Sequence, residues 1–165
     1  MELSFAQACE RGTFRLVHYS LQGNHVHIVE AEDQCALGRG MKVLGSRIAR
    51  AANRVFGRSG PVLADRYHLH VLRTPREVRN ALGYVLSNAR VHMARAGRTL
   101  SRGFQIDPAS SGRWFDGWAC RPASHGPDDL VAVAPPRTWL LAKGWRARGL
   151  LDPDEMPTGA AAAGA

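Results

Sequence analysis

The first part of the chain has the residue pattern of two β-strands joined by a short turn. The segments Phe14–Ser20 and His25–Ala31 are rich in β-branched, aromatic and other apolar residues, and the turn-forming stretch Leu21–Asn24 separates them. Together they predict a β-hairpin. Upstream, Phe5–Glu10 predicts the end of a helix that Gly12 closes.

A long amphipathic helix is predicted from Asp33 to Phe56. Asp33 is a suitable N-cap residue, and Gly57 follows the predicted C-terminal end. Apolar residues recur at spacings of three, four and seven, at Leu37, Met41, Leu44, Ile48 and Val55.

After a turn, the pattern predicts a further strand within Leu63–Leu72 and then a second helix. Thr74, Pro75 and Glu77 form a typical helix start, with a cap, proline at the first helical position and an acid in the first turn. This helix is expected to run to Arg95. Its apolar side consists of Val78, Leu82, Val85, Ala89 and Met93.

The remainder of the chain carries weaker signals. Residues 99–137 are rich in Gly, Ser, Pro and Asp, which is typical of loops, and Trp114, Phe115 and Trp118 are their strong apolar anchors. One short helix is predicted over Thr138–Arg148. From Pro153 on, the composition predicts a disordered tail.

Charge adds a candidate partner. Lys and Arg total 22 against 14 Asp and Glu, a net charge of +8, which favours a polyanion such as DNA or RNA. The first long helix carries five cations and no acid, at Arg39, Lys42, Arg47, Arg50 and Arg54. A solvated helix face is the simpler interpretation of these cations; the lack of any acid favours a phosphate-facing surface.

Several classes of protein are not expected. No apolar run approaches the roughly 18 residues that span a bilayer, and the first residues lack the pattern of a signal peptide, so we expect a cytoplasmic protein with no membrane partner. Cys9, Cys35 and Cys120 are odd in number and never form a C-x-x-C pair, which argues against a disulfide framework and a zinc ribbon.

Two His-x-His triplets are candidates for metal chemistry. His25 and His27 lie in one predicted strand, and His68 and His70 lie in another. Alternate residues of a strand face the same side, so each triplet offers two imidazoles to one metal ion. Hydrogen-bonded or surface histidines are the simpler alternative.

A candidate nucleophile lies in the second helix. Tyr84 and Asn88 are four residues apart and are expected on one helix face. A phenol is a weak nucleophile at neutral pH unless a metal or cations stabilise its phenolate. The amide oxygen of Asn88 suits a hard cation such as Mg²⁺ or Mn²⁺. Alone, the two residues are more typical of a half-buried aromatic and a surface amide than of a reactive site.

Three segments together resemble the HUH-type single-tyrosine transposases. The first runs from Phe14 to His27 and ends in Asn24-His25-Val26-His27; the second runs from Gly57-Arg58 to Arg66-Tyr67-His68; the third is Leu82-Gly-Tyr84-Val-Leu-Ser-Asn88. The match is closest to the branch associated with repetitive extragenic palindromes, where Asn typically follows the tyrosine by one turn. It covers about residues 5–97.

The resemblance implies roles for individual residues. His25, His27 and Asn88 would hold a divalent metal, Mg²⁺ or Mn²⁺, and Tyr84 would be the nucleophile. His68 and His70 would lie outside the metal motif, as structural or DNA-contacting residues. The expected partner is single-stranded or hairpin DNA. For the oligomeric state, a homodimer is one alternative to a monomer. Expected DNA contacts are Arg39, Lys42, Arg47, Arg50, Arg54, Arg58 and Arg66.

The resemblance also implies a fold and a cellular setting. The fold is α+β, a ferredoxin-like antiparallel sheet with helices on one face, whose first strand would precede Phe5, where only four residues stand. We therefore expect a catalytic domain over 1–98 that lacks its first strand, a loop-rich extension over 99–152 and a tail over 153–165. The implied setting is the cytoplasm of a bacterium, at the nucleoid.

The resemblance implies a metal-dependent DNA strand transferase that forms a 5′-phosphotyrosine intermediate. One alternative is a non-catalytic nucleic-acid-binding remnant of such a transposase. Another, a cupin-like metal site of His25, His27 and Glu32, requires further short strands, whereas the sequence continues into a long helix.

Overall fold

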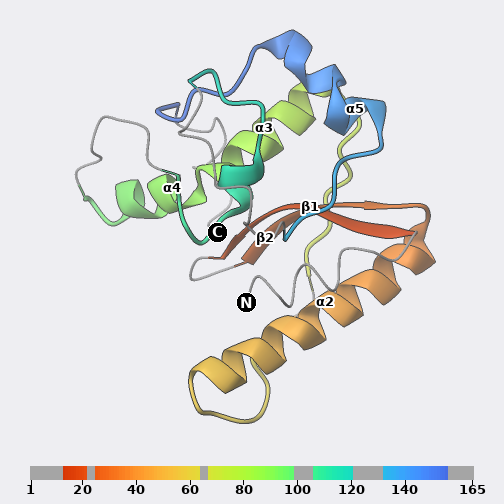
Figure 1. The fold of residues 1–165 in the computed structure, drawn as a ribbon, viewed down its shortest axis with the longest axis vertical. Coiled ribbons are helices and arrows are strands. Elements are labelled where there is room, and N and C mark those ends of the chain that lie inside the picture. The colour runs from red at the N-terminus through yellow and green to blue at the C-terminus, as the bar shows by residue number, and fades with distance from the viewer. Residues whose placement is uncertain (1–12, 22–24, 64–66, 99–105, 121–131, 156–165) are drawn as a thin grey trace. The chain divides into compact units, whose positions relative to one another are not determined.

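The computed structural model describes residues 13–21, 25–63, 67–98, 106–120 and 132–155. Their fold is α+β, with a two-stranded antiparallel sheet and several helices (Figure 1). The strands β1 (Phe14–Leu21) and β2 (His25–Ala31) confirm the predicted hairpin. None of the helices among the described residues is long and apolar enough to cross a membrane.

The chain divides into two compact units. Unit 1 consists of Met1–Val17, Val29–Val71 and Leu130–Pro136, and unit 2 consists of His18–Ile28, Leu72–Asp129 and Arg137–Ala165. Both units contain residues from before and after position 98. The helix predicted at Phe5–Glu10 lies outside the described residues.

Unit 1 is built on helix α2 (Gln34–Val55), which confirms the predicted helix. The side chain of Asp33 caps it by accepting a hydrogen bond from the Ala36 amide at 2.6 Å. At the other end Gly57 adopts a φ of 58°, and the Arg58 amide donates to the Asn53 carbonyl at 3.0 Å, which closes the helix as a Schellman motif.

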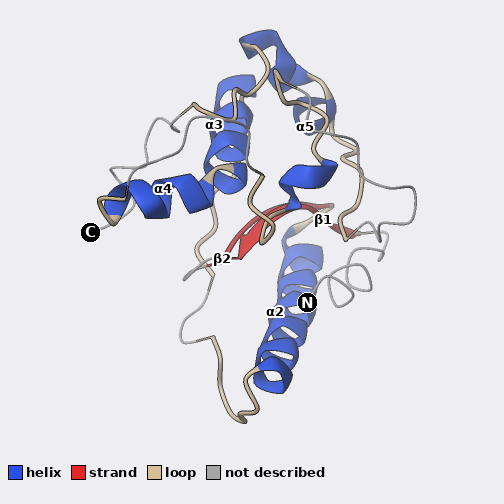
Figure 2. Cartoon of the chain, turned by 60° about the vertical axis from the view of Figure 1, so that its left-hand side comes forward, coloured by secondary structure: helices blue, strands red, loops and turns tan. Residues whose placement is uncertain are grey.

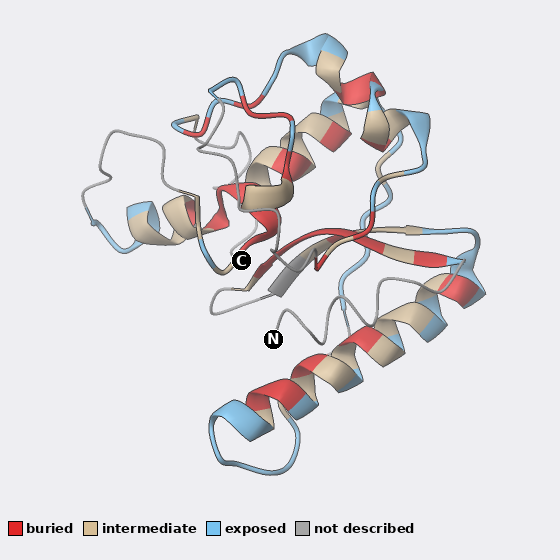
Figure 3. Ribbon diagram, in the orientation of Figure 1, coloured by how far each residue is buried: buried red, intermediate tan, exposed pale blue. Residues whose placement is uncertain are grey.

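One face of α2 is buried and the other is exposed (Figure 3). The buried face includes Leu44 and Ile48. Phe14 of β1 packs directly on the helix backbone at Gly40, where an added β-carbon would lie 2.1 Å from the phenyl ring. Glycine at position 40 is therefore what allows the strand and the helix of unit 1 to approach this closely.

The strand predicted within Leu63–Leu72 is wrong for the residues that the structure describes. Residues 67–72 form no strand, and Tyr67, Leu69 and Val71 are all exposed. An alternating pattern indicates a strand only if a neighbouring strand pairs with its backbone, and the described residues offer this segment none. Residues 64–66 lie outside the described part.

Unit 2 contains helices α3 (Pro75–Leu86) and α4 (Asn88–Arg95). The predicted capping box of α3 is confirmed, with Thr74 and Glu77 bonded reciprocally. The single helix predicted to Arg95 is wrong, since Ser87 interrupts it with φ −105° and ψ 16° and α4 takes a different direction (Figure 2). Serine and asparagine compete for backbone hydrogen bonds, which favours a break here.

The C-terminal half of unit 2 forms an aromatic cluster beside α3. Phe115 stacks on Trp145 with ring centroids 5.5 Å apart and meets Trp118 edge-on at 5.3 Å. Phe115 directly follows the 3-10 helix η1 (Ser111–Trp114), and Trp145 lies in the 3-10 helix η2 (Gly144–Arg148), which packs against α3. Phe115, Trp118 and Trp145 of this part of the chain are therefore buried in the core of unit 2.

The predicted short helix over Thr138–Arg148 divides in two. Helix α5 (Trp139–Ala142) comes first, and η2 follows after a break at Lys143. The first three residues of the predicted disordered tail, 153–155, are ordered: Pro153 is buried and Glu155 accepts a hydrogen bond from Arg79. Residues 156–165 lie outside the described part.

Candidate functional site

The proposed third metal ligand, Asn88, is the first residue of α4 and is 1% exposed. Its Nδ2 atom donates to the Oγ atom of Ser20 on β1 at 3.4 Å. Its Oδ1 atom is buried and accepts no hydrogen bond within the described part of the chain. A buried acceptor with no hydrogen bond costs free energy unless another group uses it, and a divalent cation is such a group. Asn88 thus fits the ligand role.

Tyr84 lies in the last turn of α3 and is half-buried. Its neighbours Leu82 and Val85 are buried and fix that turn of the helix in the core of unit 2. The spacing predicted that Tyr84 and Asn88 share one face of a continuous helix. This prediction is wrong, because the helix breaks at Ser87 between them. Their relative position depends on the angle between two helices.

The two predicted histidine ligands belong to the strand that pairs with β1. β2 begins at His25, so His25 and His27 occupy alternate positions of one strand. His27 is half-buried, whereas the side chain of His25 lies outside the described part. Asn88, Tyr84 and both histidines belong to unit 2. Their roles stay predictions.

The second triplet is in a different environment. His68 and His70 are exposed and belong to unit 1. The described residues contain no cluster of three or more His, Cys, Asp or Glu side chains that could hold a metal ion. The predicted set differs from such a cluster, because its third ligand is the amide of Asn88.

The predicted DNA-contacting cations all belong to unit 1. Arg39, Lys42, Arg50 and Arg54 are exposed on α2, and Arg47 is half-buried. Arg58 is exposed and donates to the Pro61 carbonyl at 3.0 Å. Arg66 lies outside the described residues. The helix thus presents an acid-free cationic surface opposite its apolar face.

Unit 2 contains a buried polar cluster of His18, Tyr19 and Ser111 that the sequence pattern did not predict. His18 of β1 bonds through Nδ1 to the Oγ atom of Ser111 at 3.2 Å, and the same Oγ accepts from the Tyr19 amide at 3.0 Å. Burial lowers the pKa of His18 to about 4, against a smaller opposing effect of Asp116. His18 is therefore neutral at pH 7. Its partner lies 93 residues away in sequence, so no local signal identifies it.

Comparisons with known proteins give no family assignment. No protein-family model matches the chain, and neither a curated protein nor a solved structure was found that matches it. The interpretation of the site therefore depends on its own residues and on the motif resemblance.

Proposed function

We propose that this protein is a metal-dependent DNA strand transferase that cleaves and rejoins single-stranded or hairpin DNA. The observation that carries the proposal is the buried Oδ1 atom of Asn88, which accepts no hydrogen bond among the described residues. Asn88 lies four residues after Tyr84, just beyond the break at Ser87. The acid-free cationic face of α2 supports a polyanionic partner independently.

The proposed reaction needs only one covalent group from the chain. The Tyr84 oxygen attacks the scissile phosphorus and forms a phosphotyrosine bond to the 5′ side, while the bond from phosphorus to the 3′ oxygen breaks. The phenolic proton is lost and the departing oxygen gains one, which leaves a free 3′-hydroxyl. The phosphodiester energy is kept in the new bond, so rejoining is the same step in reverse.

The proposed cofactor is Mg²⁺ or Mn²⁺ held by His25, His27 and Asn88. When bound, such an ion polarises a phosphate and stabilises the charge that develops on it. Asn88 offers a neutral oxygen whose amide is oriented by Ser20. Leu82 and Val85 are buried and fix the turn of α3 that carries the half-buried Tyr84.

Incubation of the full chain with a labelled hairpin oligonucleotide and Mg²⁺ tests this proposal. We expect a covalent protein–DNA adduct that survives denaturing electrophoresis. His27→Ala should lower the rate of adduct formation at least about 100-fold. Loss of a residue that merely hydrogen-bonds to a metal ligand already costs up to about 100-fold, and loss of the ligand itself costs no less. His70→Ala, the matched control, should leave it unchanged. The opposite pattern would place the metal with the second triplet.

A second candidate is a non-catalytic nucleic-acid-binding domain, which the cationic face of α2 favours by itself. In this case the protein binds the hairpin and forms no adduct under any metal condition. The two candidates share the binding surface and differ only in the chemistry at Tyr84.

The role of α2 in binding has its own test. For Arg39→Ala/Arg50→Ala/Arg54→Ala, the slope of log K against log salt for a single strand should fall by about 2, since each phosphate contact contributes about 0.7. The control Arg76→Ala/Lys143→Ala/Arg148→Ala removes the same charge from exposed sites of unit 2. Equal slopes for the two triple variants would exclude α2 as the DNA-binding surface.

A further inference from the structure

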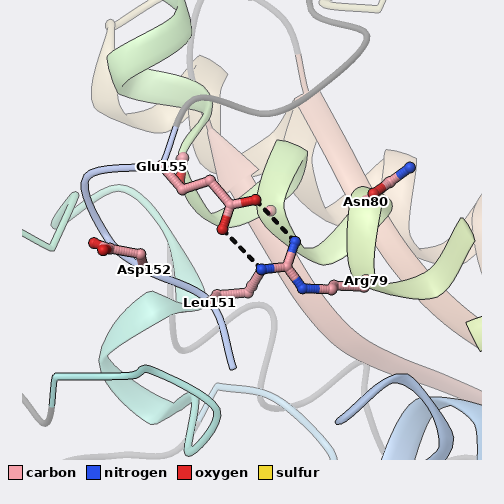
Figure 4. A pocket seen from close by; sticks show the side chains of 7 residues that line it. Arg79, Asn80, Leu151, Asp152 and Glu155 are labelled. Atoms are coloured by element: carbon pink, nitrogen blue, oxygen red, sulfur yellow. Dashed lines mark hydrogen bonds and ion pairs between the residues drawn. The ribbon is translucent and has the colours of Figure 1, made fainter. Parts of the chain in front are cut away.

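Residues 149–155, here called the C-terminal segment, hold α3 through Arg79. The Arg79 guanidinium donates from Nη1 and Nη2 to the two carboxylate oxygens of Glu155, each at 2.8 Å (Figure 4). It also donates to the Gly149 and Leu150 carbonyls, each at 3.1 Å. Hydrogen bonding from Arg79 is the main cause that lowers the pKa of Glu155. A bidentate pair of this kind fixes both partners in direction as well as distance.

The same segment also reaches α4. Asp154 forms an ion pair with Arg90, with Nη1 and Oδ1 3.2 Å apart. Arg79 lies before the break at Ser87, and Arg90 lies after it. Two adjacent acids of one segment thus hold two helices that a break separates.

The C-terminal segment is itself fixed to unit 2. Leu151 is 2% exposed and pairs in parallel with Trp118. Its amide donates to the Gly117 carbonyl at 3.0 Å, and its carbonyl accepts from the Ala119 amide at 2.8 Å. The Asp152 carboxylate accepts from the Asp154 amide at 2.8 Å, which shapes the turn that carries both acids. Asp154 and Glu155 are therefore presented from an anchored turn.

Helix α4 is short and has a small buried face. It is eight residues long, its N-cap Ser87 makes no side-chain hydrogen bond to it, and its buried residues are Asn88 and Val91. A helix this short is marginal by itself in water and depends on tertiary contacts. By contrast, α3 has a capping box and four buried residues. Of the two helices, α4 is the one whose position an external contact decides.

We propose that the C-terminal segment is a brace that fixes the angle between α3 and α4. Glu155 holds α3 through Arg79, and Asp154 holds α4 through Arg90. The consequence for chemistry rests on the proposed function: the brace sets Asn88 relative to Tyr84. Asp154, Glu155, Arg79 and Arg90 are then positioning residues that act through the two site residues.

Hydrogen exchange of the full chain tests the brace without any DNA. In Asp154→Asn/Glu155→Gln, the α4 amides should exchange about three- to tenfold faster, while those of α2 keep their rates. Asp116→Asn is the matched control, because it removes the ion pair of Asp116 with Arg146, 2.6 Å apart, which involves neither helix. The charge exchange Arg90→Asp/Asp154→Arg should restore protection relative to Arg90→Asp alone. Unchanged α4 exchange in the double variant overturns the proposal.

Adduct formation then separates the brace from the proposed function. We expect the rate constant at saturating hairpin DNA to fall about tenfold in Asp154→Asn/Glu155→Gln while the Kd for the hairpin stays the same, because α2 is unaltered. If the double variant shows faster α4 exchange but the wild-type protein forms no adduct, the brace is supported and the strand transferase is rejected. If the wild type forms the adduct and the double variant has the same α4 exchange rates and the same rate constant for adduct formation, the brace is rejected and the strand transferase is retained.

Discussion

Tyr84→Phe is expected to abolish covalent attachment of the protein to DNA. Loss of a covalent nucleophile lowers the rate on the order of 10⁴- to 10⁶-fold, because no other group takes over the displacement. The fold should tolerate the change, since the ring remains and no hydrogen bond among the described residues uses this hydroxyl. The unfolding free energy should stay within about 0.5 kcal/mol of wild type. The measurement is denaturing electrophoresis of labelled hairpin DNA with Mg²⁺, together with urea unfolding.

Tyr67→Phe is the matched control for this experiment. Tyr67 is exposed in unit 1 and has no role in the proposed reaction. We expect this variant to form the adduct at the wild-type rate, and both Phe variants to bind the hairpin as wild type does. An adduct that persists in Tyr84→Phe would assign the nucleophile to another residue and end the proposal in its present form.

Acid should destabilise the protein through His18. The pKa of His18 is about 4 in the folded chain and near its ordinary value of 6.5 in the unfolded chain, so the unfolded state binds more protons between these values. The stabilisation is fully present above pH 6.5 and is lost as the pH falls through 4. A difference of this size corresponds to about 3 kcal/mol. Urea unfolding at a series of pH values between 8 and 4 measures it.

Variants separate the effect of His18 from the other titrating groups. His18→Gln removes the titration and should flatten the dependence of the unfolding free energy on pH by about 3 kcal/mol over that range. His70→Gln, which replaces an exposed histidine, is the matched control. Parallel curves for wild type and His18→Gln would show that His18 is not the group that acid titrates.

Elements that local signals define were predictable. The hairpin, the Asp33 cap with the glycine end of α2, and the capping box of α3 are each encoded within a few residues. The strand predicted within Leu63–Leu72 failed because its pattern is local, while strand formation needs a partner elsewhere. The break at Ser87 was missed because neither proline nor glycine marks it.

The candidate site was predictable only as far as it lies within single elements. The spacing of Tyr84 and Asn88, and that of His25 and His27, can be read along the chain. The groups that orient Asn88 and hold its helix cannot, because Ser20 is 68 residues away from Asn88, and Asp154, which pairs with Arg90 of α4, lies far along the chain. Long-range packing brings those partners together, and a sequence pattern does not record it.

The close packing of Phe14 on the backbone of α2 at Gly40 has an evolutionary consequence. A relative with any other residue at position 40 places a β-carbon where the phenyl ring lies, and therefore needs a smaller side chain at position 14. Selection acts on these two positions as a pair. In a collection of related sequences, we expect positions 14 and 40 to covary although they are far apart in the chain.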